Sequence, residues 1–236
     1  MSTYQKINTL FMRDDKGLII PEKLTCPEFE YLKNNIFECT EKIDGTNIRI
    51  EIDGKSIEFK GRTDNAVLPV ELEAFLKNKF TPDLVFRALN FNPEEGLPEN
   101  IHITIYGEGF GRKIQGCGAR YIKNGVNFIL FDIKIGSWWI KRKDLECIAN
   151  KLDTPIVPII GYMNIVDAIQ FVKKGFKSTI SEDKDLDAEG LVLRTPNILL
   201  FRNGERIITK IKTSDFRKYI ATHGDIFDNL NPRYEG

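Results

Sequence analysis

Lys42 lies between two acidic residues, Glu41 and Asp44, in the stretch "ECTEKIDGTNIRI", which otherwise reads as the start of an apolar strand. A lysine on a strand usually points to water, and its ammonium form is not a nucleophile. Nearby positive charge would favour the neutral amine, whereas carboxylates alone would do the opposite. We therefore expect the two acids to orient the amine, read a base, or hold metal-bound water beside a nucleotide with Mg²⁺.

The composition is that of an ordinary soluble globular protein, with 236 residues, 34 basic and 34 acidic side chains, and 42% hydrophobic residues. Because the net charge is zero, a polyanion would have to be bound by a local patch. The four cysteines form no C-x-x-C pair, which argues against a zinc site or disulfide framework and favours a reducing, cytoplasmic environment. No apolar run is long enough to span a bilayer, so we expect no membrane partner.

The hydrophobic pattern predicts a mixed α+β fold built on antiparallel sheets. Residues 37–61 alternate in polarity around an Asp53-Gly54 turn, which predicts a hairpin with Lys42 just before it. Further strands are expected at 101–106, 126–135, 156–162, 190–194 and 206–212. Helices are expected at 69–80, 81–91, 141–152, 165–174 and 215–221, with Asn164 and Gly175 at the ends of the fourth.

A glycine-rich loop is expected between the strands at 101–106 and 126–135. It holds six glycines and the basic residues Arg112, Lys113, Arg120 and Lys123. Such a loop lets the backbone approach a ligand closely. A solvated loop and an RNA-contacting loop are both consistent with this composition.

The K-x-D-G sequence at Lys42 to Gly45 resembles motif I of the covalent nucleotidyltransferases, the superfamily of ATP-dependent DNA and RNA ligases and mRNA-capping guanylyltransferases. The other motifs follow in chain order: "GRT" with Arg62, "YGEGFG" with Glu108, "NFILFDI" with Phe131, "EGLVLR" with Glu189 and Arg194, and "ITKIK" with Lys210 and Lys212. Asn47, after Gly-Thr, is similar to the phage-type ligases that seal nicks in double-stranded RNA. The resemblance implies an ATP-grasp-like ligase adenylylation domain, with antiparallel sheets flanked by helices.

The same resemblance implies an ATP-dependent RNA ligase of RNA repair, which joins 3′-hydroxyl and 5′-phosphate RNA ends with ATP and Mg²⁺ or Mn²⁺. Lys42 would attack the α-phosphate of ATP, releasing pyrophosphate and forming lysyl-AMP. AMP would then pass to the RNA 5′-phosphate, and the 3′-hydroxyl would displace it. All three steps are in-line displacements at phosphorus, in which positioning and charge neutralisation supply most of the catalysis.

The resemblance also implies a role for each matching residue. The catalytic set is Lys42 as nucleophile with Asp44, Glu189, Lys210 and Lys212, in which Glu189 would hold the metal and Asp44 would assist through water. Lys210 and Lys212 are two apart on a strand, so both amines lie on the face where they would contact the α-phosphate. Nucleotide contacts fall to Glu41 at the adenine edge, Ile43, Asn47, Arg62, Glu108 at the ribose, Phe131 stacked on adenine, Lys210 and Lys212. RNA contacts fall to Asn47, Arg62 and Arg194.

Taken singly, these residues have ordinary explanations, such as a solvated Lys42 or a core position for Phe131. The alternatives are a DNA or mixed-duplex nick ligase, a GTP-using capping enzyme, which Asn47 disfavours, and a catalytically inactive binder of nucleotides or RNA ends. The residues after Lys212 are too few for the OB-fold or helical C-terminal domain of relatives. We therefore expect one nucleotidyltransferase domain over 1–236 without such a C-terminal domain, and a separate RNA-binding partner could take its place.

Overall fold

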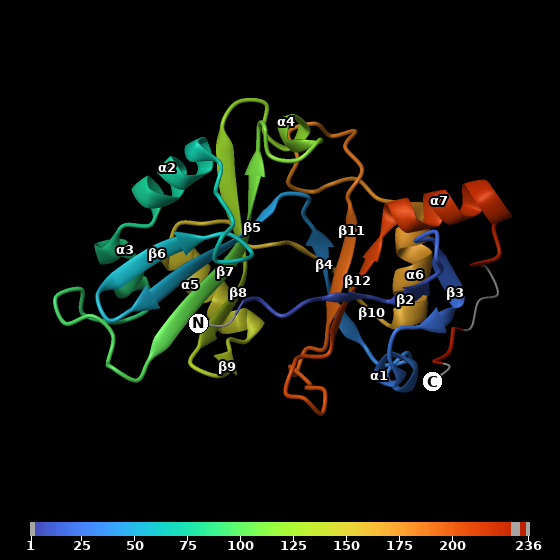
Figure 1. Cartoon of the computed structure of the whole chain (residues 1–236), viewed down its shortest axis with the longest axis horizontal. Coiled ribbons are helices and arrows are strands. Elements are labelled where there is room, and N and C mark those ends of the chain that lie inside the picture. The colour runs from blue at the N-terminus through green and yellow to red at the C-terminus, as the bar shows by residue number, and fades with distance from the viewer. Residues whose placement is uncertain (1–2, 228–231, 235–236) are drawn as a thin grey trace. The chain divides into compact units, whose positions relative to one another are not determined.

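The chain forms two compact units in this computed structural model, which describes residues 3–227 and 232–234 (Figure 1). The first unit comprises residues 44–157 with short pieces at 3–4 and 180–183. The second unit comprises residues 5–43, 158–179 and the described residues from 184 onward. The single nucleotidyltransferase domain expected over 1–236 stays a prediction.

The first unit is built on one antiparallel sheet with the strand order β6-β5-β7-β8-β9. Its strands are β5 (Thr46–Asp53), β6 (Ser56–Lys60), β7 (His102–Gly111), β8 (Val126–Ile135) and β9 (Trp138–Trp139). Its helices are α2 (Val70–Lys79), α3 (Pro82–Ala88), α4 (Gly118–Tyr121) and α5 (Arg142–Lys151).

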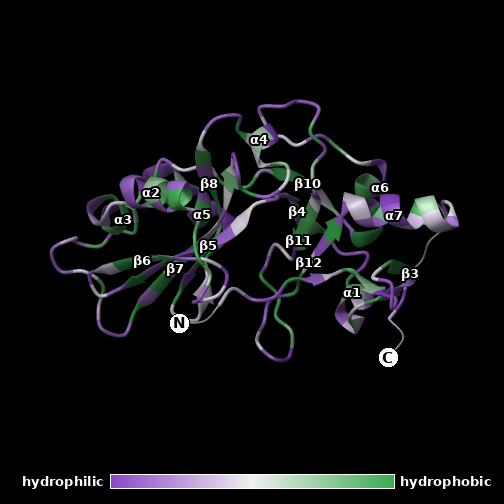
Figure 2. Ribbon diagram, turned by 45° about the horizontal axis from the view of Figure 1, so that its top comes forward, coloured by the Kyte–Doolittle hydropathy of each residue, from purple (hydrophilic) through white to green (hydrophobic). Residues whose placement is uncertain are grey.

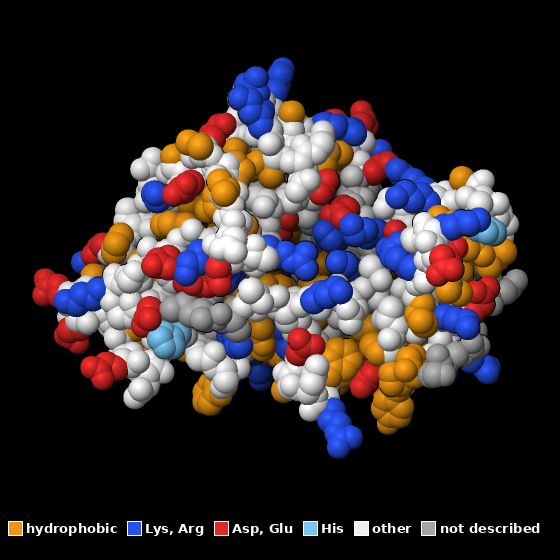
Figure 3. Space-filling view, in the orientation of Figure 1, with side chains coloured by type: hydrophobic (Ala, Val, Ile, Leu, Met, Phe, Trp, Pro, Cys, Tyr) orange, Lys and Arg blue, Asp and Glu red, His pale blue; other side chains and the backbone are white. Residues whose placement is uncertain are grey.

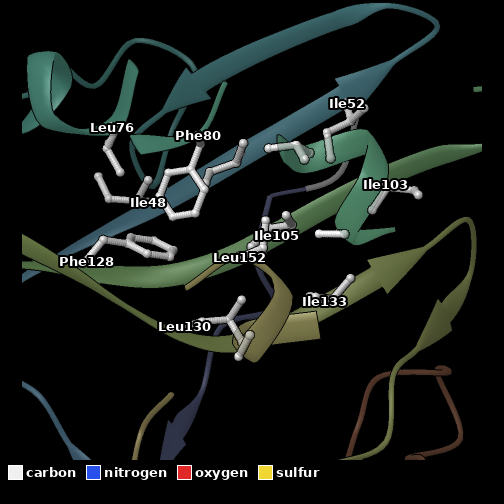
Figure 4. Close-up of a cluster of buried hydrophobic side chains, with 14 of the residues drawn as sticks. Ile48, Ile52, Leu76, Phe80, Ile103, Ile105, Phe128, Leu130, Ile133 and Leu152 are labelled. Atoms are coloured by element: carbon white, nitrogen blue, oxygen red, sulfur yellow. The ribbon is translucent and has the colours of Figure 1, made fainter. Parts of the chain in front are cut away.

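The core of the first unit lies between one face of this sheet and helices α2, α3 and α5. Ile48, Ile50 and Ile52 alternate along β5 and are fully buried. Figure 4 shows Ile48 and Ile52 in this cluster with Phe80 and Phe128, whose rings meet edge to face at 5.3 Å. Because a one-residue slip would turn all three isoleucines outward, their burial fixes the register of β5.

The second unit contains a sheet with the strand order β1-β12-β11-β4-β10, in which only the β1–β12 pair is parallel. These strands are β1 (Asn8–Thr9), β12 (Ile208–Lys212), β11 (Gly190–Arg194), β4 (Phe37–Lys42) and β10 (Ile159–Met163). A two-stranded sheet of β2 (Phe11–Arg13) and β3 (Ile19–Leu24) and helices α1 (Pro27–Tyr31), α6 (Ile165–Lys174) and α7 (Thr213–His223) complete the unit.

Helix α6 shows how the second unit builds its core. Its buried residues, Ile165, Ala168, Ile169 and Val172, recur every three or four positions and join the same cluster as strands β4 and β11. Figure 2 shows that hydrophilic residues are interleaved with hydrophobic ones along the helices. Both predicted ends of α6 are confirmed, because the Asn164 side chain accepts the Asp167 N–H at 2.8 Å and Gly175 has a φ of +76°.

The predicted α+β class with antiparallel sheets is confirmed, but several boundaries were wrong. Phe37–Lys42 is not part of the hairpin, because β4 pairs with β10 and β11 in the second unit. The hairpin turn is Gly54-Lys55, since Asp53 and Ser56 are cross-strand partners. Strand β7 continues through "GEGFG", so this part of the expected glycine loop is strand.

Further boundaries shift at the end of the chain, and short elements were not predicted. The strand expected at 156–162 is β10, which starts at Ile159, and the last helix runs from Thr213 to His223. Strands β1, β2, β3 and β9 and helices α1 and α4 were missed because two to six residues carry too little periodicity.

All four cysteines are free thiols. Burial raises the pKa of Cys39 to about 12 and that of Cys26 to about 11, so both stay protonated and unreactive. In the described part of the chain, no helix has the length and apolar composition needed to cross a bilayer.

Gly190 opens β11 where this strand runs closest to β12. A Cβ at this position would overlap the carbonyl oxygen of Ile211, and the φ of +152° is one that side-chain-bearing residues rarely adopt. We expect Gly190→Ala to lower the free energy of unfolding by about 2 kcal/mol or more, measured by urea denaturation. Gly116→Ala is the control, because a Cβ there meets nothing within 4 Å. Equal stability of Gly190→Ala and wild type would contradict this account.

Candidate active site

Three predicted catalytic residues meet at the ends of neighbouring strands in the second unit. Gly190 is the cross-strand partner of both Lys42 on β4 and Lys212 on β12, and Glu189 directly precedes it. Lys42 Nζ donates to Glu189 Oε2 at 2.6 Å, and Lys212 Nζ lies 2.7 Å from Glu189 Oε1. Each oxygen of one carboxylate therefore holds one lysine. The side chains are 16–32% exposed, which leaves the cluster accessible to a ligand.

Lys210 lies on the same face of this sheet. It is the partner of Val192 on β11, two residues from the Lys212–Gly190 pair. Strand alternation therefore puts Lys210 and Lys212 on one face, as the sequence predicted. With Lys42, the face carries three lysines around the carboxylate of Glu189, and this excess of positive charge suits a phosphate.

Arg194 is held by a buried carboxylate in this structure. Its Nε donates to Glu38 Oε1 at 2.7 Å, and the two side chains are 14% and 4% exposed. The cross-strand register places Arg194 opposite Glu38 on β4. Its assignment to a phosphate of RNA stays a prediction.

Glu41 is buried and points away from the lysine face, since it alternates with Lys42 along β4. Its carboxylate accepts hydrogen bonds from Ser178 Oγ, from the Thr179 N–H at 2.9 Å and from Thr179 Oγ1 at 2.6 Å. The segment it holds pairs with the residues leading into Glu189, because Ser178 N donates to the Leu186 carbonyl. Glu41 thus supports the approach to Glu189, and its adenine contact stays a prediction.

In the first unit, the Asp44-Gly45 turn is held by the segment that follows β7. Gln115 Nε2 donates to the Gly45 carbonyl at 2.9 Å, Cys117 Sγ to Asp44 Oδ2 at 3.0 Å, and the Asp44 N–H to Tyr121 Oη at 3.3 Å. A Cβ on Gly45 would overlap the backbone of β7, so close approach requires this glycine. Sequence analysis named Asp44 but missed the three residues that fix it.

Two predicted ligand contacts are cross-strand partners in the first unit. Asn47 on β5 lies directly opposite Glu108 on β7. Asn47 Oδ1 is buried and accepts no hydrogen bond from the described residues. Because an unpaired buried acceptor is costly, this atom suits a donor supplied by a ligand.

Phe131 occupies a bulge in β8. The pairing of β7 with β8 shifts between Tyr106 and Gly107, which leaves Phe131 as an extra residue on its strand. A bulge re-aims a side chain, and Phe131 is half-buried rather than part of the core. Its ring meets that of Tyr4 edge-on at 5.2 Å, while Tyr4 Oη donates to Asp132 Oδ2 at 2.6 Å. Adenine stacking by Phe131 stays a prediction.

Arg62 lies on an exposed loop that a second, buried arginine holds at both ends. Arg49 Nε donates to the Gly61 carbonyl at 2.9 Å, and its Nη atoms donate to Glu51 Oε1 and Asp64 Oδ1, each at 2.6 Å. The hydrogen bond from Arg49 holds the pKa of Asp64 below its usual range. Arg62 makes no ion pair among the described residues. Alternation in "NIRIEID" made Arg49 read as a solvated residue, whereas it is fully buried.

We expect Arg49→Met to lower the free energy of unfolding by about 3 kcal/mol, because it leaves the buried Glu51 without one of its two cationic partners. Urea denaturation measures the change. Arg87→Met is the matched control, since the Arg87–Asp83 pair is 71% and 63% exposed and should contribute less than about 1 kcal/mol. Equal losses in the two variants would refute the role of Arg49.

The donor set fits a divalent cation bound together with substrate phosphates. The part of the chain described by the structure contains no cluster of three or more His, Cys, Asp or Glu residues able to hold a metal. Mg²⁺ is usually bound by one or two carboxylates plus phosphates and water rather than by a protein cage. Glu189 supplies such a carboxylate, and Asp44 is a second in the first unit.

The chain belongs to the RNA ligase family, whose model matches residues 35–212, about three quarters of the sequence. No curated protein matches the chain in sequence.

Solved structures with this fold include RNA ligases of Naegleria gruberi. A variant with ATP and Mn has a TM-score of 0.63 and 18% identity, over 94% of this chain and 58% of the other. The ligase with PPi has a TM-score of 0.59 and 20% identity, over 93% and 63%. A variant with AMP and Mn has a TM-score of 0.58 and 19% identity, over 90% and 62%. The chain thus has the RNA-ligase nucleotidyltransferase fold and spans about three fifths of these proteins.

Proposed function

We propose that this chain is an ATP-dependent RNA ligase in which Lys42 becomes covalently adenylylated. The observation that carries the proposal is the Lys42–Glu189–Lys212 cluster, in which a nucleophile candidate and a cation share one carboxylate. Family membership and a fold also seen in structures with ATP, PPi and AMP support the same reaction.

Attack by Lys42 requires the neutral amine. Glu189 Oε2 lies 2.6 Å from Lys42 Nζ, within reach to orient the amine and to take its proton. The Lys42 Nζ–phosphorus bond then forms as the bond from the α-phosphorus to pyrophosphate breaks. Lys210 and Lys212 place positive charge where the α-phosphate carries negative charge.

Glu189 is the proposed ligand of a divalent cation, Mg²⁺ or Mn²⁺, with Asp44 acting through water. When bound, such an ion supplies neutralisation of phosphate charge. The adenosine contacts proposed are Glu41, Ile43, Glu108 and Phe131.

The proposed second substrate is RNA with 5′-phosphate and 3′-hydroxyl ends. Asn47 and Arg62 are proposed to contact the RNA termini, because the first has an unpaired buried acceptor and the second an exposed cation. The phage-type branch rests on Asn47. A reducing cytoplasmic location agrees with the four free thiols.

Incubation with ATP and Mg²⁺ should raise the intact mass of the protein by about one AMP, and pyrophosphate should reverse the gain. We expect no adduct in Lys42→Ala or in Lys42→Arg, because a guanidinium stays protonated and cannot attack. Lys218→Ala, which removes an exposed lysine, should be adenylylated like wild type. ATP binding without any adduct would leave only a binding module, and an adduct formed with GTP instead would indicate a capping enzyme.

Asn47→Ala should form the AMP adduct at the wild-type level but lose at least about tenfold in sealing of 5′-phosphate RNA, since one bidentate or buried contact contributes about this factor. Gel analysis of labelled RNA ends measures sealing, with a DNA duplex in parallel. Asn78→Ala, at an exposed position of α2, is the control. Failure of Asn47→Ala already at the adduct would refute its assignment to RNA.

A further inference from the structure

The connection from β7 to β8, residues 112–125, is the most one-sidedly charged part of the first unit. It contains Arg112, Lys113, Arg120 and Lys123 and no acidic residue, although basic and acidic residues balance over the whole chain. We propose that this β7–β8 connection binds the phosphate backbone of the RNA substrate. The proposal rests on the proposed ligase function and adds a surface that the motif residues do not include.

The backbone of the connection is held in an unusual shape at its basic end. Lys113 and Gln115 have left-handed torsions, with φ values of +65° and +55°. Between them, Ile114 is buried and its N–H donates to the Gly111 carbonyl at 3.0 Å. The Arg112 N–H donates to the Gly125 carbonyl at 2.9 Å, so both ends of the connection are tied together. Strained backbone of this kind persists where surrounding contacts enforce it, often at functional positions.

These constraints leave three basic side chains on the surface without an acidic partner. Arg120 pairs with Asp183 at 2.6 Å. Arg112, Lys113 and Lys123 are exposed and make no ion pair with any residue that the structure describes. Figure 3 shows Lys and Arg side chains gathered at the upper edge of the view, where Figure 1 places the β7–β8 connection.

RNA is the polyanion that fits this surface best. The connection holds the Asp44-Gly45 turn through Gln115 and Cys117, and this turn follows Lys42 by two residues in the chain. Exposed arginine and lysine recognise phosphates without reading bases, as an enzyme that joins RNA ends of different sequence requires. Three such contacts would also make binding strongly dependent on salt.

The test measures binding of a 5′-phosphorylated RNA duplex with a nick, by fluorescence anisotropy over a series of salt concentrations. The variant replaces all three side chains, as Arg112→Gln, Lys113→Gln and Lys123→Gln. We expect its affinity to fall at least about tenfold at low salt and the slope of log K against log salt to decrease by about three, about one for each lost phosphate contact. Each single variant should lower the slope by about one.

The control removes the same charge elsewhere in the first unit, as Lys55→Gln, Lys141→Gln and Lys143→Gln, all at exposed positions. It should bind RNA with nearly the wild-type slope. Intact mass after incubation with ATP and Mg²⁺ should show the AMP adduct in both triple variants. An unchanged slope in the first variant, or an equal loss in the control, would overturn the proposal even if adenylylation is normal. Absence of the adduct from wild type would refute the proposed function instead.

Discussion

A single carboxylate shared by two lysines is the interaction on which the chemistry of the second unit depends. Glu189 holds Lys42 through one oxygen and Lys212 through the other. In this state the amine of Lys42 is oriented but paired with a negative charge, which stabilises its ammonium form. An incoming phosphate competes with Glu189 for the lysines and brings a negative charge of its own. The cluster can therefore hold Lys42 in place before ATP arrives and release it for attack afterwards.

The rest of the second unit keeps this cluster in register. The three residues come from positions 42, 189 and 212, so only the β4–β11–β12 ladder brings them together. Gly190 allows β11 and β12 to approach, because no side chain fits beside the Ile211 carbonyl. On the opposite face of β4, Glu41 uses its carboxylate to fix Ser178 and Thr179, in the segment that pairs with the residues before Glu189. Adjacent acids flanking the lysine thus have different tasks.

Sequence patterns predicted most of what depends on local chemistry. The order of the motifs led to the family, alternation predicted that Lys210 and Lys212 share a face, and Asn164 and Gly175 marked the ends of α6. Contacts between distant segments could not be read in this way. Arg49 and Glu41 both looked like solvated strand residues, and only tertiary contacts show that they are buried and hydrogen-bonded. The bulge at Phe131 likewise depends on the pairing of two strands.

The position of the adduct tests the central claim most directly. Protein incubated with ATP and Mg²⁺ would be digested at neutral pH, because a phosphoramidate is labile to acid, and its peptides analysed by tandem mass spectrometry. The account predicts AMP on Lys42, with Lys210 and Lys212 unmodified. AMP on either of those lysines, or on a residue outside the cluster, would contradict it.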